Sequence, residues 1–222
     1  MREYHVRICE RLSGKFRWST RRSIYVKSEK SARRVSEKII HYIEDKLLLK
    51  VNRSKTKISR PWESHLLGFS FYKKKGEFLI RIGAKALKSI KTKCKMITRS
   101  SDPTEKPIKL RKLDEIIRGW VNYFKIANAK TKMEELDEMI RTRLRITEWR
   151  NWKRIRTRVK NLMKLGVVKS TSYQWGNTSK GPCRVAHSPI LQRTLTKIYW
   201  KKQGYQGFIH YYRQTHLQPL MF

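Results

Sequence analysis

Residues Leu110–Leu144 read LRKLDEIIRGWVNYFKIANAKTKMEELDEMIRTRL, and the spacing of their apolar residues decides the fold class. The apolar positions fall three or four residues apart in two sets: Leu110, Leu113, Ile117, Trp120 and Phe124, then Met133, Leu136, Ile140 and Leu144. This spacing places each set on one face of an α-helix. Thr131 and Glu134 have the spacing of a capping box, which predicts that the second helix begins there.

A third helix is predicted upstream of this pair. Its apolar stripe follows the same spacing: Leu87, Ile90, Cys94 and Ile97. The segment SSDPTEKP, with Pro103 and Pro107, predicts a break between this helix and the next. Three amphipathic helices of this length can bury a common core.

The first part of the chain predicts a small α+β element. SIYV, at residues 23–26, is a short β-type run, and Ser28 can cap a helix running to about Lys46. LLLKVN and SKTKIS are typical of short strands or a strand and a turn. HLLGFSFY and FLIRI flank a turn that carries Gly76, which predicts a hairpin. The predicted fold class is therefore mainly α, with a small N-terminal α+β element and a helical bundle.

The last part is less regular. SYQWGNTSKGP, at residues 172–182, has a loop-like composition. Ser188 followed by Pro189 predicts a helix start, and Gly204 is a plausible end for that helix. This region predicts a basic helical C-terminal extension.

The charge of the chain points to a polyanionic partner. Lys and Arg number 54 against 17 Asp and Glu, which gives a formal net charge of +37 in 222 residues. Such a charge repels itself in the folded state unless a polyanion neutralises it. Nucleic acid is the first candidate and an anionic membrane surface is the second. No window approaches the ~18 apolar residues of a transmembrane helix, so no membrane span is expected.

Catalytic and metal-binding patterns are not recognisable in the sequence. Cys9, Cys94 and Cys183 are far apart and show no CxxC spacing, which argues against a zinc ribbon and a disulfide framework. The densest acidic cluster, Glu134–Glu138, admits a metal site, but acids in the first turns of a helix are the better explanation, because adjacent helical carboxylates splay apart. We therefore expect no catalytic residue, no metal and no cofactor.

Clusters of cations with interleaved aromatic residues are the chemistry that the sequence does offer. Arg clamps phosphates, and exposed aromatic rings stack on bases. A solvated helix face or hairpin tip is the alternative for each cluster, and core packing is the alternative for each tryptophan. The predicted RNA-binding residues are Lys55, Lys73, Lys74, Lys75, Lys85, Lys88, Lys91, Lys95, Arg99, Arg118, Tyr123, Arg141, Arg143, Arg145, Trp149, Trp152, Lys153, Arg154, Arg156 and Arg158.

Several segments resemble the C-terminal part of bacterial group II intron-encoded reverse transcriptases, the maturases. Leu47–Tyr72, with its KVNRSKTK run and LLGF strand, is similar to the last blocks of their polymerase domain. RGWVNYF, at residues 118–124, and the RTRLR run after it resemble the maturase-specific thumb, and WGNTSKGP and AHSPILQRTL resemble the C-terminal extension. The resemblance divides the chain into an atypical leader (1–22), a palm remnant (23–82), a helical thumb (83–165) and a basic extension (166–222).

The resemblance implies an RNA-binding protein that helps a group II intron fold and splice. It implies structured intron RNA as the partner, and it leaves open DNA, an RNA–DNA duplex or a separate N-terminal reverse-transcriptase fragment. We expect a bacterial cytoplasmic location and no membrane partner.

The sequence departs from the family where a polymerase needs its carboxylates. Family members have a Tyr-x-Asp-Asp turn directly before the SIYV-like strand, and this chain has Trp18, Ser19, Thr20 and Arg21 there. Polymerases need carboxylates to hold two metal ions, and an arginine would repel them. We therefore expect no polymerase activity. The alternatives are a fragment of a split RNA-directed DNA polymerase and a DNA-binding module for intron mobility.

Overall fold

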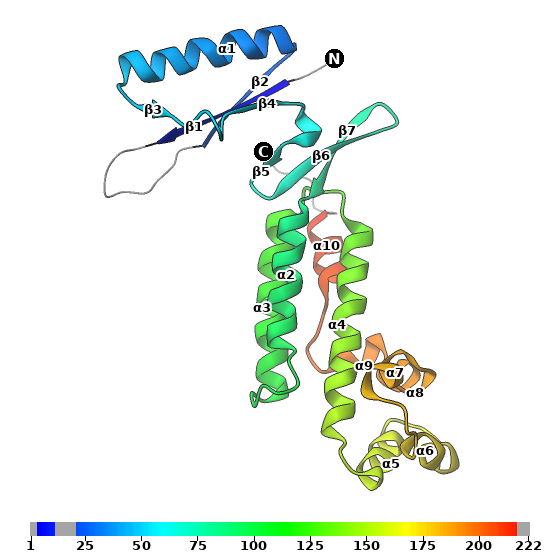
Figure 1. Cartoon of the computed structure of the whole chain (residues 1–222). Helices are drawn as coiled ribbons and strands as arrows, with labels where there is room; N and C mark the ends of the chain where they lie inside the picture. The colour runs from blue at the N-terminus through cyan, green and yellow to red at the C-terminus, as the bar shows by residue number, and fades with distance from the viewer. Residues whose placement is uncertain (1–3, 12–20, 217–222) are drawn as a thin grey trace. The chain divides into compact units, whose positions relative to one another are not determined.

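The computed structural model describes residues 4–11 and 21–216 and divides the chain into two compact units, which separate after Gly83. Unit one, residues 1–83, is called the N-terminal unit here, and residues 84–222 form the helical unit. The predicted class, mainly α with a small N-terminal α+β element, is confirmed (Figure 1). Trp18, Ser19 and Thr20, at the position of the missing carboxylates, lie outside the described residues.

A small antiparallel sheet forms the first part of the N-terminal unit. Its central strand, β1 (Tyr4–Arg11), pairs along its length with β2 (Arg21–Val26). On its other side β1 pairs with two short strands, β3 (Lys50–Val51) and β4 (Lys57–Ser59). The strand β1 therefore comes from residues that the sequence had assigned to an atypical leader.

One helix covers this sheet. Helix α1 (Glu29–His41) begins where predicted, because the Ser28 hydroxyl accepts a hydrogen bond from the amide of Ser31 at 3.2 Å. It continues as a single π-helical turn at Tyr42–Lys46. Its apolar face and the strands share a small core, made of Ala32, Ile43 and Val51, with Ile24, Val26, Ile39, Ile40 and Leu49 packed around them.

The second sheet of this unit contains two tight hairpins. After a 3-10 turn at Pro61–Glu63, β5 (His65–Leu66), β6 (Phe69–Lys74) and β7 (Glu77–Ile82) pair antiparallel in that order. The hairpin around Gly76 was predicted. The expectation of one strand through HLLGFSFY was wrong, because the chain turns at Leu67 and Gly68, where φ is +50° and +83°. Two successive positive φ values make the two-residue turn that fits the twist of a hairpin.

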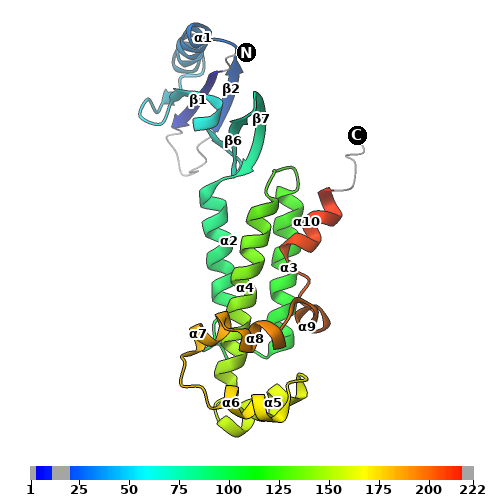
Figure 2. The same cartoon turned by 90° about the vertical axis from the view of Figure 1, so that its right-hand side faces the viewer.

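Three long helices form the frame of the helical unit. They are α2 (Ala84–Ile97), α3 (Lys106–Phe124) and α4 (Lys130–Asn151), and they run alongside one another (Figures 1 and 2). The apolar stripes predicted from the sequence supply the buried core: Ile90, Cys94, Leu110, Leu113, Ile117, Phe124, Met133, Leu136, Ile140 and Leu144. Trp120 packs edge-on against Phe208 at 5.6 Å between ring centroids, as its core alternative predicted.

Two predicted helix boundaries were wrong. Pro107 lies in the first turn of α3, where its missing N–H costs nothing, so only Pro103 stands in the connection. The capping box at Thr131 does not form, because α4 begins one residue earlier, at Lys130, after Ala129, and no side chain caps it. Local capping signals yield here to the tertiary contacts of the bundle.

Shorter helices follow, and some pack on the long ones while others pack on one another. These are α5 (Ile155–Lys164), α6 (Lys169–Gly176), α7 (Pro182–His187), α8 (Pro189–Thr194), α9 (Lys197–Lys202) and α10 (Phe208–His216). Helix α10 lies against both α3 and α4, and α7 lies against α4 (Figure 2). The described part of the C-terminal segment thus belongs to the same compact unit as the helices before it.

The sequence misjudged two of these elements. The loop expected at SYQWGNTSKGP begins instead with the second half of α6. The single helix expected from Pro189 to Gly204 is two helices, which separate at Leu195, and the Thr196 hydroxyl caps the second by accepting from the amide of Tyr199 at 3.3 Å. Gly204 ends α9 with φ of +97°, as predicted.

Candidate nucleic-acid interface

A stripe of lysines runs along α2. Lys85, Lys88, Lys91 and Lys95 follow at spacings of three and four, so they share one side of the helix. Lys91 is half-buried and the other three are exposed. The helix contains no Asp or Glu, so no acid of its own offsets these charges. A stripe of this kind is suited to contact a row of phosphates.

Arginines of α4 extend the positive charge to the end of α2. Arg143 donates to the Thr98 hydroxyl at 2.7 Å and to the carbonyl of Lys95 at 3.0 Å. Arg150 donates to the Ser100 hydroxyl at 2.6 Å. Burial, and then the nearby Arg150, lower the pKa of Arg143. Two guanidinium groups held close together in this way stabilise the structure best when an anion lies between or beside them.

The two tryptophans predicted to stack on bases are buried. Trp149 is 1% exposed and Trp152 is 7% exposed, and their ring centroids lie 5.9 Å apart. Arg158 covers the first ring, with its guanidinium carbon 4.6 Å from the ring centroid, and it donates to the carbonyl of Trp152 at 3.0 Å. These side chains hold α5 against α4, so the expectation that Trp149 and Trp152 stack on RNA was wrong on grounds of access.

Arg145 also has a structural role. It is 9% exposed, and its Nε and terminal nitrogen donate to the carbonyl of Leu195 at 3.2 and 3.1 Å. Burial, followed by repulsion from Arg141, lowers its pKa. A guanidinium group enclosed in this way anchors the connection between α8 and α9 and has little surface left for RNA.

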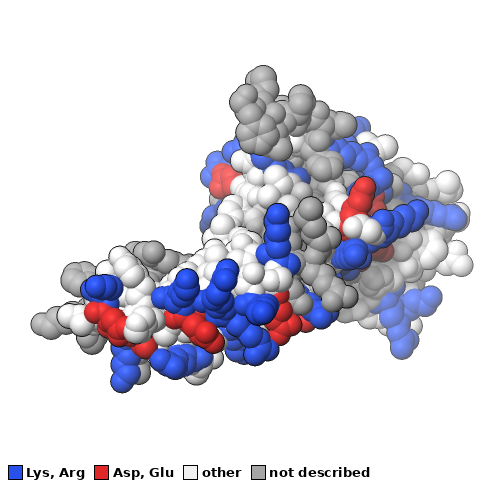
Figure 3. Space-filling view, turned by 90° about the horizontal axis from the view of Figure 1, so that it is seen from above, with Lys and Arg blue, Asp and Glu red and all other residues white. Residues whose placement is uncertain are grey.

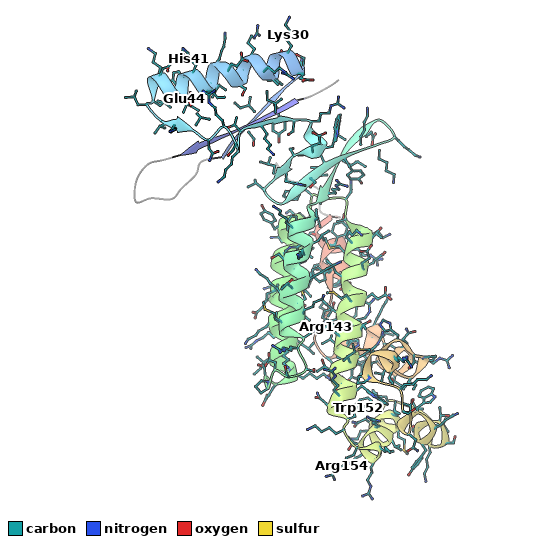
Figure 4. The ribbon with its side chains drawn as sticks, viewed as in Figure 1. Lys30, His41, Glu44, Arg143, Trp152 and Arg154 are labelled. Atoms are coloured by element: carbon teal, nitrogen blue, oxygen red, sulfur yellow. The ribbon has the colours of Figure 1, made fainter. Side chains whose placement is uncertain are left out.

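The connection from α4 to α5 remains available to a ligand. Lys153, Arg154 and Arg156 are all exposed, and no acid lies between Trp149 and Lys164. Figure 4 shows Arg154 projecting away from the helices, whereas Trp152 lies among the elements that join α4 to α5. Arg143 is labelled in the same view, on α4. The structure thus separates outward-facing from inward-facing members of one arginine-rich run.

A shallow groove between α3 and α10 was not predicted. It has a volume of about 840 Å³ and is lined by Glu115, Arg118, Gly119, Asn122, Tyr211, Gln214 and Thr215. A Cβ built on Gly119 would meet nothing within 4 Å, so no contact inside the protein requires a glycine there. Glycine in a helix interior is unfavourable by roughly 0.5–1 kcal/mol relative to alanine. The open position allows a ligand backbone to approach α3 closely.

One wall of this groove is fixed by a partly buried hydrogen bond. Tyr211 donates to a carboxylate oxygen of Asp114 at 2.6 Å. Burial, and then the bond to Asp114, raise the pKa of Tyr211 to about 12. The amides of Asn122 and Gln214 and the guanidinium of Arg118 remain to contact a ligand. Tyr123, the next aromatic residue on α3, is 53% exposed and can offer its ring.

The acidic cluster Glu134–Glu138 serves two purposes in the structure. Asp137 is 2% exposed and accepts hydrogen bonds from the Tyr205 hydroxyl at 2.8 Å and from the amides of Phe208 and Ile209 at 2.7 and 3.0 Å. It therefore caps the first turn of α10 from a different helix. Burial, and then Asp137, raise the pKa of Tyr205 well above its ordinary value. Nothing in the spacing of the acidic residues predicts that Asp137, unlike its neighbours, is buried.

The neighbouring acids line a cleft with cations that the sequence analysis overlooked. The cleft has a volume of about 700 Å³, and Glu134 and Glu138 face Arg141 together with Lys197, Lys201 and Arg213. The sequence shows Lys197 and Lys201 four residues apart, which places them on one side of a helix, but no pattern connects Arg213 with them. Because acids and bases alternate here, Arg141 contributes less net positive potential than the residues of α2.

A family comparison now identifies the frame that carries these cations. Residues 87–166 match the family described as group II intron, maturase-specific domain. This segment is a group II intron maturase-specific domain. The prediction of a C-terminal part of a maturase is thereby confirmed. A search of curated proteins found no match to the chain.

The maturase-specific domain extends from Leu87, in α2, to Gly166, just after α5. It therefore contains most of the lysine stripe, the α3 half of the groove and the exposed run after α4. Helices α6 to α10 lie beyond the matched residues but complete its core, since Trp200 and Phe208 are both fully buried.

Apart from Lys85, which begins the lysine stripe of α2, the predicted cations outside the domain lie in the N-terminal unit. Lys73, Lys74 and Lys75 are exposed at the tip of the β6–β7 hairpin, and the Lys73 amine lies 5.9 Å from the centroid of the Phe78 ring. Lys55 is exposed in the turn that follows Asn52, whose side-chain oxygen accepts from the Lys55 amide at 3.2 Å. Figure 4 places Lys30 and His41 on α1 of the same unit, where both are exposed.

Lys and Arg outnumber Asp and Glu in the sequence by 54 to 17. Figure 3 shows Lys and Arg side chains spread over the face that is viewed from above, with fewer Asp and Glu side chains among them. Within the described residues, no group of three or more His, Cys, Asp or Glu side chains could hold a metal ion, and no helix is long and apolar enough to cross a membrane. Salt-dependent binding of a polyanion is the chemistry that this arrangement supports best.

Proposed function

We propose that this chain binds structured RNA and assists a group II intron to fold and splice, without acting as a polymerase. The observation that carries the proposal is the maturase-specific domain with exposed, unneutralised cations on α2 and after α4. Each phosphate contact by Lys or Arg releases condensed counterions, which supplies affinity without sequence reading. The groove beside Gly119 adds polar groups that can read the shape of a helix.

Primer extension by this chain is not expected, because its sequence lacks the paired aspartates of the family. At the position of the paired aspartates of the family, the chain has Trp18, Ser19, Thr20 and Arg21. Two-metal catalysis needs carboxylates that clamp the attacking and leaving oxygens. Extension of a primer in Mg²⁺ by the purified chain would contradict this part of the proposal.

Salt dependence of binding tests the proposal directly. Filter binding of a folded group II intron RNA at several salt concentrations should give log K that falls linearly with log salt, by roughly 0.7–0.9 for each phosphate neutralised. A variant with Lys85, Lys88 and Lys95 changed to Gln should lower the slope by about 2–3 through loss of three contacts. Affinity that is flat with salt would sink the proposal.

Matched controls separate surface charge from folding. Lys30 is an exposed lysine of α1, in the N-terminal unit, and its change to Gln removes one charge outside the matched domain. We expect this variant to keep the parent slope. Competition by duplex DNA that matches the RNA in affinity would favour a DNA-binding module instead, and splicing of a self-splicing intron at reduced Mg²⁺ would measure the maturase role itself.

A further inference from the structure

A third and more enclosed cavity lies where α2 connects to α3. It has a volume of about 420 Å³, and the connection from α2 to α3, the first turns of α3, the second half of α4 and α9 all line it. Leu110, Leu113 and Leu144 give it an apolar wall, and Trp200, which is 1% exposed, completes this wall. Cavities of this size are typical of small-molecule and base-sized ligands, and most of the side chains that line this one are polar or charged.

The indole N–H of Trp200 makes this cavity unusual. Its Nε1 atom is buried and has no hydrogen-bond partner among the residues that the structure describes. An indole nitrogen can only donate, so it needs an acceptor that the surrounding side chains do not supply. A buried donor without a partner is costly, which makes a ligand acceptor at this point favourable.

The charges around the cavity select the kind of group that can enter. Asp102, Glu105 and Glu148 line it together with Lys106 and Lys109. Lys106 pairs with Glu148 at 2.5 Å and donates to the Tyr199 hydroxyl at 3.1 Å. Burial alone would lower the pKa of Lys106, but the hydrogen bonds and charge attraction from Glu148 and Tyr199 together outweigh it, and the pKa is raised. The lysine therefore stays charged and paired, and a carboxylate keeps further acceptor positions for an amine.

Three acids against two lysines make the interior unfavourable for a phosphate. The rim is different. Arg150 donates to the Ser100 hydroxyl and Arg143 donates to the Thr98 hydroxyl, and both Ser100 and Thr98 line the cavity. Cations therefore stand at the edge of a cavity whose inner wall carries acceptors, one free donor and apolar surface.

We propose that this cavity takes one unpaired purine base of the bound RNA. This rests on the proposed function, because the rim cations would hold the flanking phosphates. An exocyclic amine would donate to a carboxylate such as Glu148, and a ring nitrogen or carbonyl would accept from the Trp200 N–H. The base would contact Leu144, the least buried of the three leucines, and the edge of the indole, because the Lys106 amine stands over the indole face at 5.3 Å from the ring centroid. Proteins commonly read RNA through such extruded bases of loops and bulges.

Hairpin RNAs with a single-nucleotide bulge test the proposal with the full chain. We would compare adenine, guanine, uracil and abasic bulges, and a fully paired hairpin, by fluorescence anisotropy. Adenine or guanine should bind about tenfold more tightly than the abasic bulge, the gain expected for one base that becomes stacked. Uracil should gain less, because it has no exocyclic amine. Equal affinity for the purine and abasic bulges would overturn the proposal.

Two variants assign the effect to the cavity. Trp200→Phe removes the unpaired N–H and should abolish the preference for a purine, while Trp175→Phe, at a half-buried tryptophan of α6 that does not line the cavity, should keep it. Ser101→Phe adds bulk at an exposed position of the lining and should act like Trp200→Phe, so it decides the matter if the first variant does not fold. A purine preference that survives Ser101→Phe would contradict the assignment.

The paired hairpin keeps the two proposals distinguishable. Salt-dependent binding of that hairpin without any purine preference would contradict only the base site. Absence of salt-dependent binding to every hairpin would contradict both this inference and the proposed function.

Discussion

The two units of this chain are built on different amounts of core. In the N-terminal unit, the small core under α1 consists of Ala32, Ile43 and Val51, with partly buried neighbours around it. The helical unit buries large side chains completely, among them Trp149, Trp200 and Phe208. Burial of apolar surface is the main source of stability. The helical unit, which contains the maturase-specific domain, should therefore be much the more stable of the two.

Exposed apolar residues reinforce this difference. Leu48 is 85% exposed and Leu67 is 74% exposed, and both have positive φ. A leucine at positive φ is strained and gains nothing by exposure to water. The N-terminal unit thus combines a small core with local strain. The following predictions test whether the units differ in stability as this comparison requires.

The largest effect is expected at the buried carboxylate of the helical unit. Asp137→Ala removes the acceptor of three hydrogen bonds and leaves two backbone amides and the Tyr205 hydroxyl without it. We expect the free energy of unfolding to fall by about 3–5 kcal/mol, because buried donors lose a charged partner. Denaturant unfolding monitored by tryptophan fluorescence measures it.

Glu138→Ala is the matched control for this change. It removes the same charge from the next position of α4, where the side chain is exposed, and should change the free energy of unfolding by no more than about 0.5 kcal/mol. If both variants lose the same free energy of unfolding, the burial of Asp137 does not explain the loss.

The next effect concerns the N-terminal unit. Ile43→Ala empties part of its small core, and such changes cost about 2–5 kcal/mol. We expect amide hydrogens of α1 and β2 to exchange rapidly in this variant, while those of α2, α3 and α4 keep their protection. Hydrogen exchange measured by mass spectrometry would show this. Loss of protection in both units together would mean that they unfold as one body.

Arginines of the α4–α5 region sharpen the comparison between folding and binding. Arg158→Ala removes the guanidinium over Trp149 and the bond to the Trp152 carbonyl, and we expect a loss of about 1–2 kcal/mol of stability. Arg154→Ala, at an exposed position, should leave stability within about 0.5 kcal/mol but lower the salt slope of RNA binding by about 0.7–0.9. The reverse pattern would show that the two roles are assigned wrongly.

Sequence periodicity predicted the frame of the helical unit because its helices are amphipathic and long. Leu113, Ile117 and Met133 fall on the stripes and are fully buried. The roles of Arg158 and Trp149 could not be predicted in the same way. An arginine-rich run with tryptophans has the same sequence pattern whether its side chains face solvent or pack inside the protein. Which of the side chains are buried is decided only by the packing of α5 against α4. The burial of Asp137 likewise depends on α10, which lies far along the chain.

The candidate site shows the same limit. The lysines of α2 share a face because of their spacing alone, so the sequence predicted the stripe, although Lys91 proved to be half-buried. The groove beside Gly119 and the cavity beside Trp200 require segments from different helices to meet, as α3 does with α10 and α4 with α9. The glycine itself was visible, but only the open space around it distinguishes a ligand contact from a packing requirement.

The smallest expected change in stability, at Gly119, distinguishes a ligand contact from a packing requirement most clearly. Gly119→Ala adds a methyl group that meets nothing within 4 Å, so the helix should gain about 0.5–1 kcal/mol of stability. If RNA approaches α3 through this groove, the same methyl group obstructs it, and RNA affinity should fall severalfold while stability rises. Gly181→Ala is the control, because its Cβ also meets nothing within 4 Å and its position is outside the groove. Thermal unfolding and anisotropy on the same samples would measure both quantities. Unchanged RNA affinity in the more stable Gly119→Ala protein would place the contact elsewhere on the lysine-bearing helices, since no structural loss could then hide an effect on binding.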